Sequence, residues 1–272
     1  MPVVEVNGVR LAYELAGDGR PLVMIAGRGQ PAAWWHDGHA QRYVDAGYRV
    51  LTFDNRGMPP SDCPPLPYHL DDFVADAAAL LDHLGEGPYT VVGHSMGSCI
   101  AQELAARRPD LVDAVAMLAT TARQPAWIDA FHRGALELFA SGCDVSDELL
   151  VGAIFGQAYD PDGLTDDDAV RPFLDAMLTG PRWADPGRAG QWSAYAEYRG
   201  KPEVLAQVRV PTLVLAFERD LMMPPVLARE VAHAIPGSRY REMPGAGHWG
   251  WMLDPDTAHA IVLEFLAEVA PA

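Results

Sequence analysis

Residues 89–108 read YTVVGHSMGSCIAQELAARR, and this segment predicts a strand, a tight turn and a helix in direct succession. The β-branched run at 89–92 is typical of a buried strand, and residues 96–108 predict a helix that Pro109 ends. Between them, Gly93 and Gly97 flank Ser95, and glycine permits turns that a Cβ atom would block. We therefore expect a sharp turn that projects the Ser95 side chain above the sheet, at the N-terminus of a helix.

Strand-like and helix-like segments alternate on both sides of this turn. Residues 70–84 place Phe73, Leu80 and Leu84 on one face at helical spacing, as an amphipathic helix does. The other predicted helices cover 40–46 and 254–269, and the predicted strands cover 3–6, 10–15, 21–26, 48–53, 89–92, 114–119 and 211–217. This alternation favours the α/β class, with a mostly parallel β-sheet flanked by helices.

The alternation breaks between residues 121 and 205. This segment is irregular and rich in aromatic and turn-forming residues, a composition that favours an inserted helical subdomain over more sheet. We predict a core domain made of residues 1–120 and 206–272, with a helical cap of residues 121–205 inserted in it.

The net charge limits the kinds of partner. The 272 residues include 37 acidic and 20 basic side chains, with a formal charge of -17, which argues against nucleic acid and anionic membrane surfaces. No stretch approaches the ~18 apolar residues of a membrane helix, and the N-terminus lacks a secretory pattern. We expect a cytoplasmic protein whose partner is a small molecule, and leave open a homo-oligomer.

Neither a metal nor a cofactor is expected. The acidic run at 160–168 lacks the ligand spacing of a calcium loop, whereas Thr165 followed by three acids is typical of a helix start. The cysteines match no zinc or haem motif; they are Cys63, Cys99 and Cys143.

The turn around Ser95 resembles the nucleophile elbow of the α/β-hydrolase fold superfamily, and the resemblance covers nearly the whole chain apart from the insert. It implies a catalytic serine, acid and histidine in that chain order. Asp220, just past the last predicted strand, matches the acid, and His248, in a loop before the last helix, matches the base. Glu218 competes for the acid role, but it directly follows the strand and is interpreted as an edge residue. In such a triad the histidine takes the serine proton while the acid orients the imidazole.

The same resemblance implies an oxyanion hole built from two backbone N–H groups. One belongs to Met96, directly after the serine, and the other to Arg28, in the loop after the third strand. This chain reads Ala-Gly-Arg-Gly at 26–29 where the family often has His-Gly-x-Pro or His-Gly-x-Gly. The donor survives this departure because a main-chain N–H does not depend on the side chain. The segment FDNRGMPPSD at 53–62 resembles a family turn that braces the site.

The insert lies where members of this family carry a lid, so we expect it to cover Ser95 and to select the substrate. Its aromatic side chains favour a mainly apolar, medium-sized substrate. The Arg28 guanidinium could reach a substrate carboxylate or carbonyl. The candidate substrate contacts are Arg28, Trp34, Trp35, His94, Trp183, Trp192 and Trp249.

The predicted function is that of a serine hydrolase, which cleaves a carboxylic ester, lactone or thioester through an acyl-enzyme on Ser95. A serine at the elbow argues against the family's haloalkane dehalogenases and epoxide hydrolases, which use aspartate, and Lys201, the only lysine, lies too far from the acid for a plant-type hydroxynitrile lyase. Carbon-carbon bond hydrolysis and cofactor-free peroxidase or perhydrolase activity remain alternatives with the same triad. A biosynthetic cyclase or a ligand-binding member of the fold is the non-hydrolytic alternative. The arginine-rich, lysine-poor composition is typical of a GC-rich bacterium, where such enzymes often serve secondary metabolism.

Overall fold

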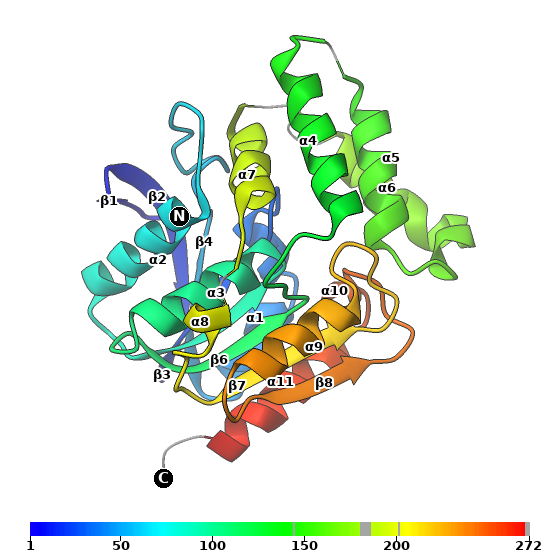
Figure 1. The fold of residues 1–272 in the computed structure, drawn as a ribbon. Coiled ribbons are helices and arrows are strands. Elements are labelled where there is room, and N and C mark those ends of the chain that lie inside the picture. Colours follow the sequence, from blue (N-terminus) through cyan, green and yellow to red (C-terminus); the bar gives the residue numbers. More distant parts are fainter. Residues whose placement is uncertain (144, 180–185, 201, 270–272) are drawn as a thin grey trace.

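A single β-sheet forms the centre of the computed structural model, which describes residues 1–143, 145–179, 186–200 and 202–269. The strand order is β1-β2-β4-β3-β5-β6-β7-β8 (Figure 1). β1 pairs antiparallel with β2, and β2 with β4, while all other neighbours are parallel. The strands are β1 (Val3–Val6), β2 (Val9–Ala16), β3 (Arg20–Ile25), β4 (Tyr48–Phe53), β5 (Tyr89–His94), β6 (Val112–Leu118), β7 (Thr212–Phe217) and β8 (Arg239–Met243).

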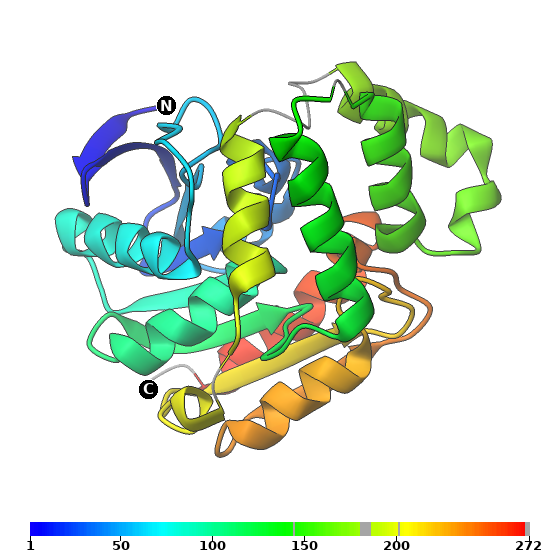
Figure 2. The same cartoon turned by 45° about the horizontal axis from the view of Figure 1, so that its top comes forward.

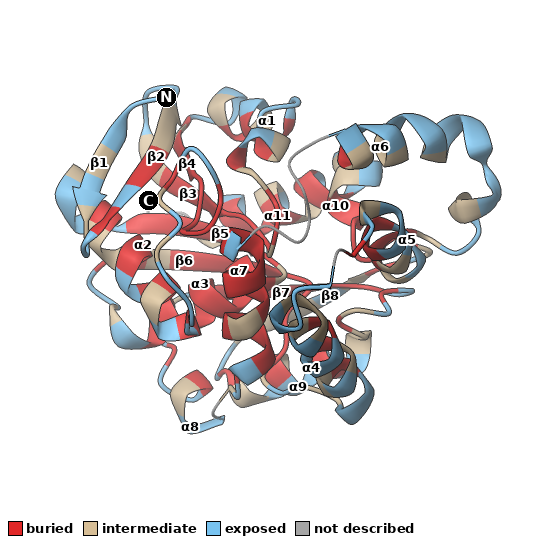
Figure 3. Ribbon diagram, turned by 90° about the horizontal axis from the view of Figure 1, so that it is seen from above, coloured by how far each residue is buried: buried red, intermediate tan, exposed pale blue. Residues whose placement is uncertain are grey.

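Helices cover both faces of this sheet (Figure 3). On one face α1 (His39–Asp45) packs against α11 (Pro255–Val269), and on the other α2 (Leu70–Leu84) packs against α3 (Met96–Arg107). α9 (Pro225–Ala234) contacts β7 and β8 farther along the sheet. Every residue of β5 and β7 is buried, as strands covered on both faces require. The predicted α/β class, with a mostly parallel sheet flanked by helices, is confirmed.

The segment between β6 and β7 is helical. It contains α4 (Ala126–Ala140), α5 (Asp147–Ala158), η2 (Gly163–Thr165), α6 (Asp167–Thr179), α7 (Pro186–Glu197) and α8 (Pro202–Leu205). Figures 1 and 2 show α4, α5 and α6 projecting beyond the sheet, with α7 nearer to α2. These helices share a second hydrophobic cluster, which includes Phe155, Met177 and Trp192 and reaches Trp249 outside the segment. The arrangement fits the cap expected at 121–205, whose status as a separate domain stays a prediction.

Parallel strands bring distant loops to one edge of the sheet. The loops after β3, β5, β7 and β8 all leave the carboxyl ends of their strands, where ligands of open α/β sheets bind. η1 (Ala32–Trp35) follows β3, and α10 (Gly250–Leu253) follows the loop after β8. Among the helices described, none is long and apolar enough to cross a membrane.

Two local features differ from the sequence analysis. β8 was not predicted, because its sequence RYREM is charged and only its last residue is buried, as suits a strand at the edge of the sheet. Thr165 and the acids after it predicted a helix start; Thr165 ends the short η2, and α6 begins at Asp167, with Asp166 in place of Thr165 as its cap. Asp166 accepts the Ala169 N–H at 3.2 Å, while the Thr165 hydroxyl donates to the Asp162 carbonyl oxygen.

Candidate active site

Ser95 lies in a strained turn between β5 and α3. Its backbone has φ 57° and ψ -121°, a combination that residues with a side chain rarely adopt. A Cβ atom on Gly93 would lie 2.3 Å from the Gly97 carbonyl oxygen, and one on Gly97 would lie 2.1 Å from the Ile25 carbonyl oxygen. The turn therefore depends on both glycines, and it holds Ser95 at the sheet edge described above.

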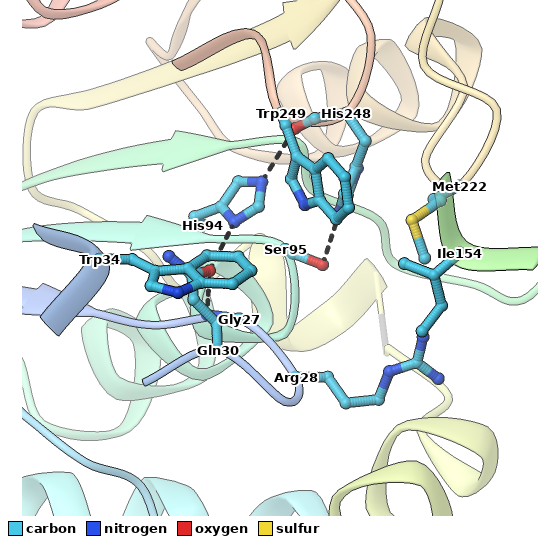
Figure 4. A pocket seen from close by; sticks show the side chains of 10 residues that line it. All are labelled: Gly27, Arg28, Gln30, Trp34, His94, Ser95, Ile154, Met222, His248 and Trp249. Atoms are coloured by element: carbon cyan, nitrogen blue, oxygen red, sulfur yellow. Dashed lines mark hydrogen bonds between the residues drawn. The ribbon is translucent and has the colours of Figure 1, made fainter. Parts of the chain in front are cut away.

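Three loops bring Ser95, His248 and Asp220 together. His248 Nε2 lies 2.9 Å from Ser95 Oγ, and His248 Nδ1 lies 2.7 Å from Asp220 Oδ2; Figure 4 shows the first of these contacts. The other Asp220 oxygen accepts the backbone N–H groups of Met222 and Met223 at 2.8 and 2.7 Å. This fixes the carboxylate, which in turn keeps the His248 proton on Nδ1 and leaves Nε2 able to accept the Ser95 proton.

Glu218, the competing acid, takes a different place. It is exposed, and its Oε2 accepts the Gly245 N–H at 2.7 Å. It thus braces the loop before His248, whereas Asp220 occupies the position bonded to the imidazole.

Two glutamines fix the loop after β3. Gln30 Oε1 accepts the Gly27 N–H at 3.1 Å, and Gln191 Oε1, from α7, accepts the Gly29 N–H at 2.6 Å. Gln191 Nε2 also donates to the Arg56 carbonyl oxygen at 2.8 Å. Neither glutamine was predicted, because Gln191 crosses from α7 and Gln30 also contacts His94 Nδ1 at 3.1 Å, and contacts between distant segments leave no local pattern.

The backbone N–H groups of Arg28 and Met96 have no such partners. Within the described ranges, no acceptor lies at the Arg28 N–H, although its neighbours in the loop are bonded. Met96 is the first residue of α3, so its N–H has no acceptor within the helix. Both groups are therefore available for a ligand oxygen beside Ser95.

His94 positions the loop that carries His248. It is 1% exposed, and its Nε2 lies 3.0 Å from the His248 carbonyl oxygen. Burial, reinforced by the nearby His248, holds the pKa of His94 well below its usual value, so the ring is neutral. Its Nδ1 lies 3.1 Å from Gln30 Oε1, so both ring nitrogens face an oxygen that can only accept, and the neutral ring can donate to one of them at a time. Although His94 lines the pocket, its ring is held between these two oxygens.

A pocket opens directly at Ser95 (Figure 4). Apolar side chains from four parts of the chain contribute to its wall, and Met222 lies beside Ile154 in the view. Trp34 and Trp249, both predicted substrate contacts, line it, and their ring centroids are 6.2 Å apart. The lining residues are Gly27, Arg28, Gln30, Trp34, His94, Ser95, Ile154, Met222, His248 and Trp249.

Two other predicted contacts lie outside the lining of this pocket. Trp35 is fully buried and packs on Trp251, with ring centroids 4.1 Å apart; it belongs to the core because the 3-10 turn η1 directs it away from Trp34. Trp192 is 2% exposed and lies under the Arg28 guanidinium, 3.5 Å from ring centroid to Cζ. Trp183 lies outside the described residues.

The turn after β4 braces the loops around the site, as expected. Arg56 donates from Nε and Nη2 to the two oxygens of Asp76, each at 2.6 Å, and both side chains are buried. Asp54 Oδ1 accepts the Ala32 N–H at 2.8 Å. Burial raises the pKa of Asp54 to about 6, against the opposing effect of that hydrogen bond.

The acidic run at 160–168 makes contacts inside the protein. Asp160 Oδ2 accepts the Gly163 N–H at 3.0 Å, and Asp160 and Asp162 both pair with Arg219. The described residues contain no cluster of three or more His, Cys, Asp or Glu side chains arranged to hold a metal ion.

A strand order of this kind, with a serine, a histidine and an aspartate hydrogen-bonded at the carboxyl edge, defines a class of proteins. The profile of the alpha/beta hydrolase fold matches residues 20–141, and a relative 35% identical to this chain spans 96% of it. The chain belongs to the α/β-hydrolase fold family.

That relative is a Mycobacterium tuberculosis protein named non-heme bromoperoxidase BpoC, and the match covers 99% of its length. Its crystal structure superposes with a TM-score of 0.90, over 96% of this chain and 97% of that one. A protein of Azorhizobium caulinodans named carbamate hydrolase RutD is 28% identical over 99% of both chains. The enol-lactonase of Burkholderia xenovorans is 25% identical, with a TM-score of 0.83, over 98% of this chain and all of its own.

Proposed function

We propose that this protein is a serine hydrolase that cleaves a carboxylic ester, lactone or thioester of a medium-sized, mainly apolar small molecule. The observation that carries the proposal is the chain of contacts from Ser95 through His248 to Asp220, at 2.9 and 2.7 Å, at the floor of an apolar pocket. Trp34, Ile154 and Trp249 favour an apolar substrate there.

The proposed reaction has two steps. Ser95 Oγ attacks the substrate carbonyl carbon while His248 Nε2 takes the hydroxyl proton, and the Arg28 and Met96 N–H groups stabilise the developing oxyanion. His248 then gives the proton to the leaving alcohol or thiol. Water attacks the acyl-enzyme in the second step, again with His248 as base, and Ser95 is regenerated.

The charge of the protein limits its partner. A protein of formal charge -17 is a poor match for nucleic acid, so we propose a small molecule as its partner. We propose the cytoplasm as its place of action. We also propose that residues 121–205 act as the cap that excludes water and selects the substrate.

A series of 4-nitrophenyl esters of increasing acyl length, measured beside a set of lactones, tests this proposal. We expect hydrolysis of several members, with kcat/KM rising through medium acyl lengths as the apolar wall is covered. No turnover of any ester or lactone by folded protein would overturn it.

Perhydrolase activity is the second candidate, because one relative is named a bromoperoxidase. Hydrogen peroxide would then replace water as the acceptor of the acyl group, giving a peracid from the same acyl-enzyme. Adding peroxide to the ester assay and measuring monochlorodimedone bromination separates the two activities. Bromination that depends on both a carboxylic acid and Ser95 would support the perhydrolase.

A further inference from the structure

Arg28 is partly buried, and its guanidinium has no carboxylate partner among the described residues. Its Nη1 is buried and lacks a hydrogen-bond partner among the described residues, and its Cζ lies 3.5 Å from the ring centroid of Trp192. Arg56, also buried, is by contrast bonded to Asp76 through two nitrogens. A buried donor without an acceptor is costly, so the buried Nη1 of Arg28 is open to an acceptor from a ligand.

A second pocket shares Arg28, Ser95 and Met222 with the first. His132 and Tyr195, from the segment between β6 and β7, line it. His132 is 2% exposed, and its Nδ1 also lacks a partner in the described part of the chain. Two buried polar groups without partners thus line one cavity that reaches Ser95.

The charge of this cavity comes from Arg28. Burial, and then the nearby guanidinium, lower the pKa of His132 to about 2, so the imidazole is neutral. Burial lowers the pKa of Arg28 to about 10, which still leaves the guanidinium charged near neutral pH. A neutral imidazole can donate a hydrogen bond from Nδ1 without adding charge. One cation and one neutral donor fit a single carboxylate.

We infer that the Arg28 guanidinium binds a carboxylate of the substrate, with His132 as a second donor. The substrate class is then an acyl compound with an apolar part against Trp34 and Trp249 and one carboxylate remote from the scissile bond. Cleavage of that bond rests on the proposed function, whereas binding of the carboxylate at Arg28 does not. Arg28 supplies both the proposed oxyanion donor and the guanidinium, so the spacer between substrate carbonyl and carboxylate should match an arginine side chain in length.

The competing explanation is that Arg28 only ties α7 to the loop after β3 by stacking on Trp192. Stacking of this kind gives the guanidinium a favourable cation-π contact, but it offers no acceptor to Nη1. The two explanations differ in one measurable property, because only a carboxylate site distinguishes a charged ligand from its neutral methyl ester.

Equilibrium binding to the Ser95→Ala protein tests the site without turnover. The probes are monomethyl adipate, which carries one carboxylate, and dimethyl adipate, which carries none, both titrated by calorimetry. We expect the charged probe to bind roughly 10- to 150-fold tighter. Adding Arg28→Gln should remove this preference, and Arg28→Lys should keep part of it, because the ammonium retains charge but loses the planar fork.

Arg133→Gln is the matched control. Arg133 lies on α4, one residue from His132, but its side chain is 66% exposed and pairs with Asp129, so this change removes the same charge outside the cavity. It should leave the preference for the charged probe unchanged. Equal binding of both probes to the Ser95→Ala protein, or a preference that survives Arg28→Gln, would overturn the carboxylate site.

A second assay tests whether the carboxylate site at Arg28 acts in the proposed hydrolysis. With 4-nitrophenyl hydrogen adipate and 4-nitrophenyl methyl adipate, the ratio of the two kcat/KM values should favour the acid and should collapse in Arg28→Gln. The ratio cancels any common loss of rate from the altered loop. If the charged probe binds better but neither ester is hydrolysed, the carboxylate site stands and the proposed hydrolase fails.

Discussion

At the scale of single residues, the backbone conformation of Ser95 sets the chemistry. A φ of 57° costs free energy in a residue with a side chain, and here that strain places Oγ 2.9 Å from His248 Nε2. The hydroxyl makes no contribution to the hydrophobic core. We therefore expect Ser95→Ala to lower kcat/KM for a 4-nitrophenyl ester by at least ~10³-fold, with the melting temperature preserved. Activity within tenfold of the unaltered protein would exclude Ser95 as the nucleophile.

The acid of the triad is tested by a pair of matched changes. Asp220→Asn keeps the shape of the side chain but replaces the acceptor that holds the His248 proton on Nδ1, so kcat should fall by about 10²- to 10⁴-fold. His248→Ala should be at least as damaging. Glu218→Gln is the control, because Glu218 lies two residues before Asp220 and its side chain bonds the Gly245 N–H rather than the imidazole; it should change kcat less than about threefold. A larger loss in Glu218→Gln than in Asp220→Asn would reverse the assignment.

Sequence reasoning reached the residues of the site that have local patterns. Ser95 is flanked by glycines, Asp220 follows the strand predicted at 211–217, and His248 lies before the predicted last helix, so the family resemblance could assign their places. Trp35 and Trp192 could not be distinguished from Trp34 and Trp249 in this way, because a sequence does not show the direction in which each side chain points. Gln191 acts through long-range hydrogen bonds to the Gly29 N–H and the Arg56 carbonyl oxygen, and Gln30 through a contact with His94, none of which a sequence spacing indicates.

At the scale of elements, α7 holds the loop that carries the proposed oxyanion donor. Gln191→Leu would remove the acceptor of the Gly29 N–H and the donor to the Arg56 carbonyl oxygen. Two buried backbone groups would then lack partners, at about 1–3 kcal/mol each in the free energy of unfolding.

We expect Gln191→Leu to lower kcat by about tenfold with little change in KM. A loosened loop would displace the oxyanion donor, which weakens the stabilisation of the transition state more than the binding of the substrate. Ester kinetics and urea unfolding measure the two effects. Gln207→Leu is the control, since its amide is exposed and bonds only to Glu203. A loss of stability with unchanged kcat would mean that α7 has no part in positioning the donor.

Elements differed in how well the sequence predicted them. β4 and α2 matched their predicted limits, 48–53 and 70–84, because a long apolar run and a helical period each bury one continuous surface. The bounds of α4 to α7 could not be read from the sequence, since these helices pack on one another through a separate cluster. The hydrophobic pattern of such a segment reflects several partners at once.

At the scale of the whole molecule, buried histidines couple stability to pH. Burial lowers the pKa of His132 to about 2 and that of His259 to about 3, and it also lowers the pKa values of His39 and His94. An unfolded chain binds these protons near pH 6.5, whereas the folded chain does not. The free energy of unfolding must therefore fall as the pH drops below about 6.5.

Asp54 opposes this trend. Its pKa is raised from 3.8 to about 6, so the folded state binds its proton first and gains stability as the pH falls through that range, offsetting about one histidine. We expect the free energy of unfolding in urea to be about 2–5 kcal/mol lower at pH 5 than at pH 7.5. His259→Gln should reduce that difference and His83→Gln, at an exposed site, should not. Equal stability at both pH values would contradict the buried, neutral histidines.

We expect this α/β hydrolase to form a covalent intermediate on Ser95. Trapping that intermediate tests the role of Ser95 most directly. Diethyl 4-nitrophenyl phosphate transfers its phosphoryl group to an activated serine and releases 4-nitrophenol, leaving an ester that water removes slowly. Intact-mass spectrometry followed by peptide mapping should show one diethylphosphoryl group per chain, on the peptide that contains Ser95, and none on folded Ser95→Ala protein. No label, or a label that persists in Ser95→Ala, would contradict the covalent intermediate on Ser95.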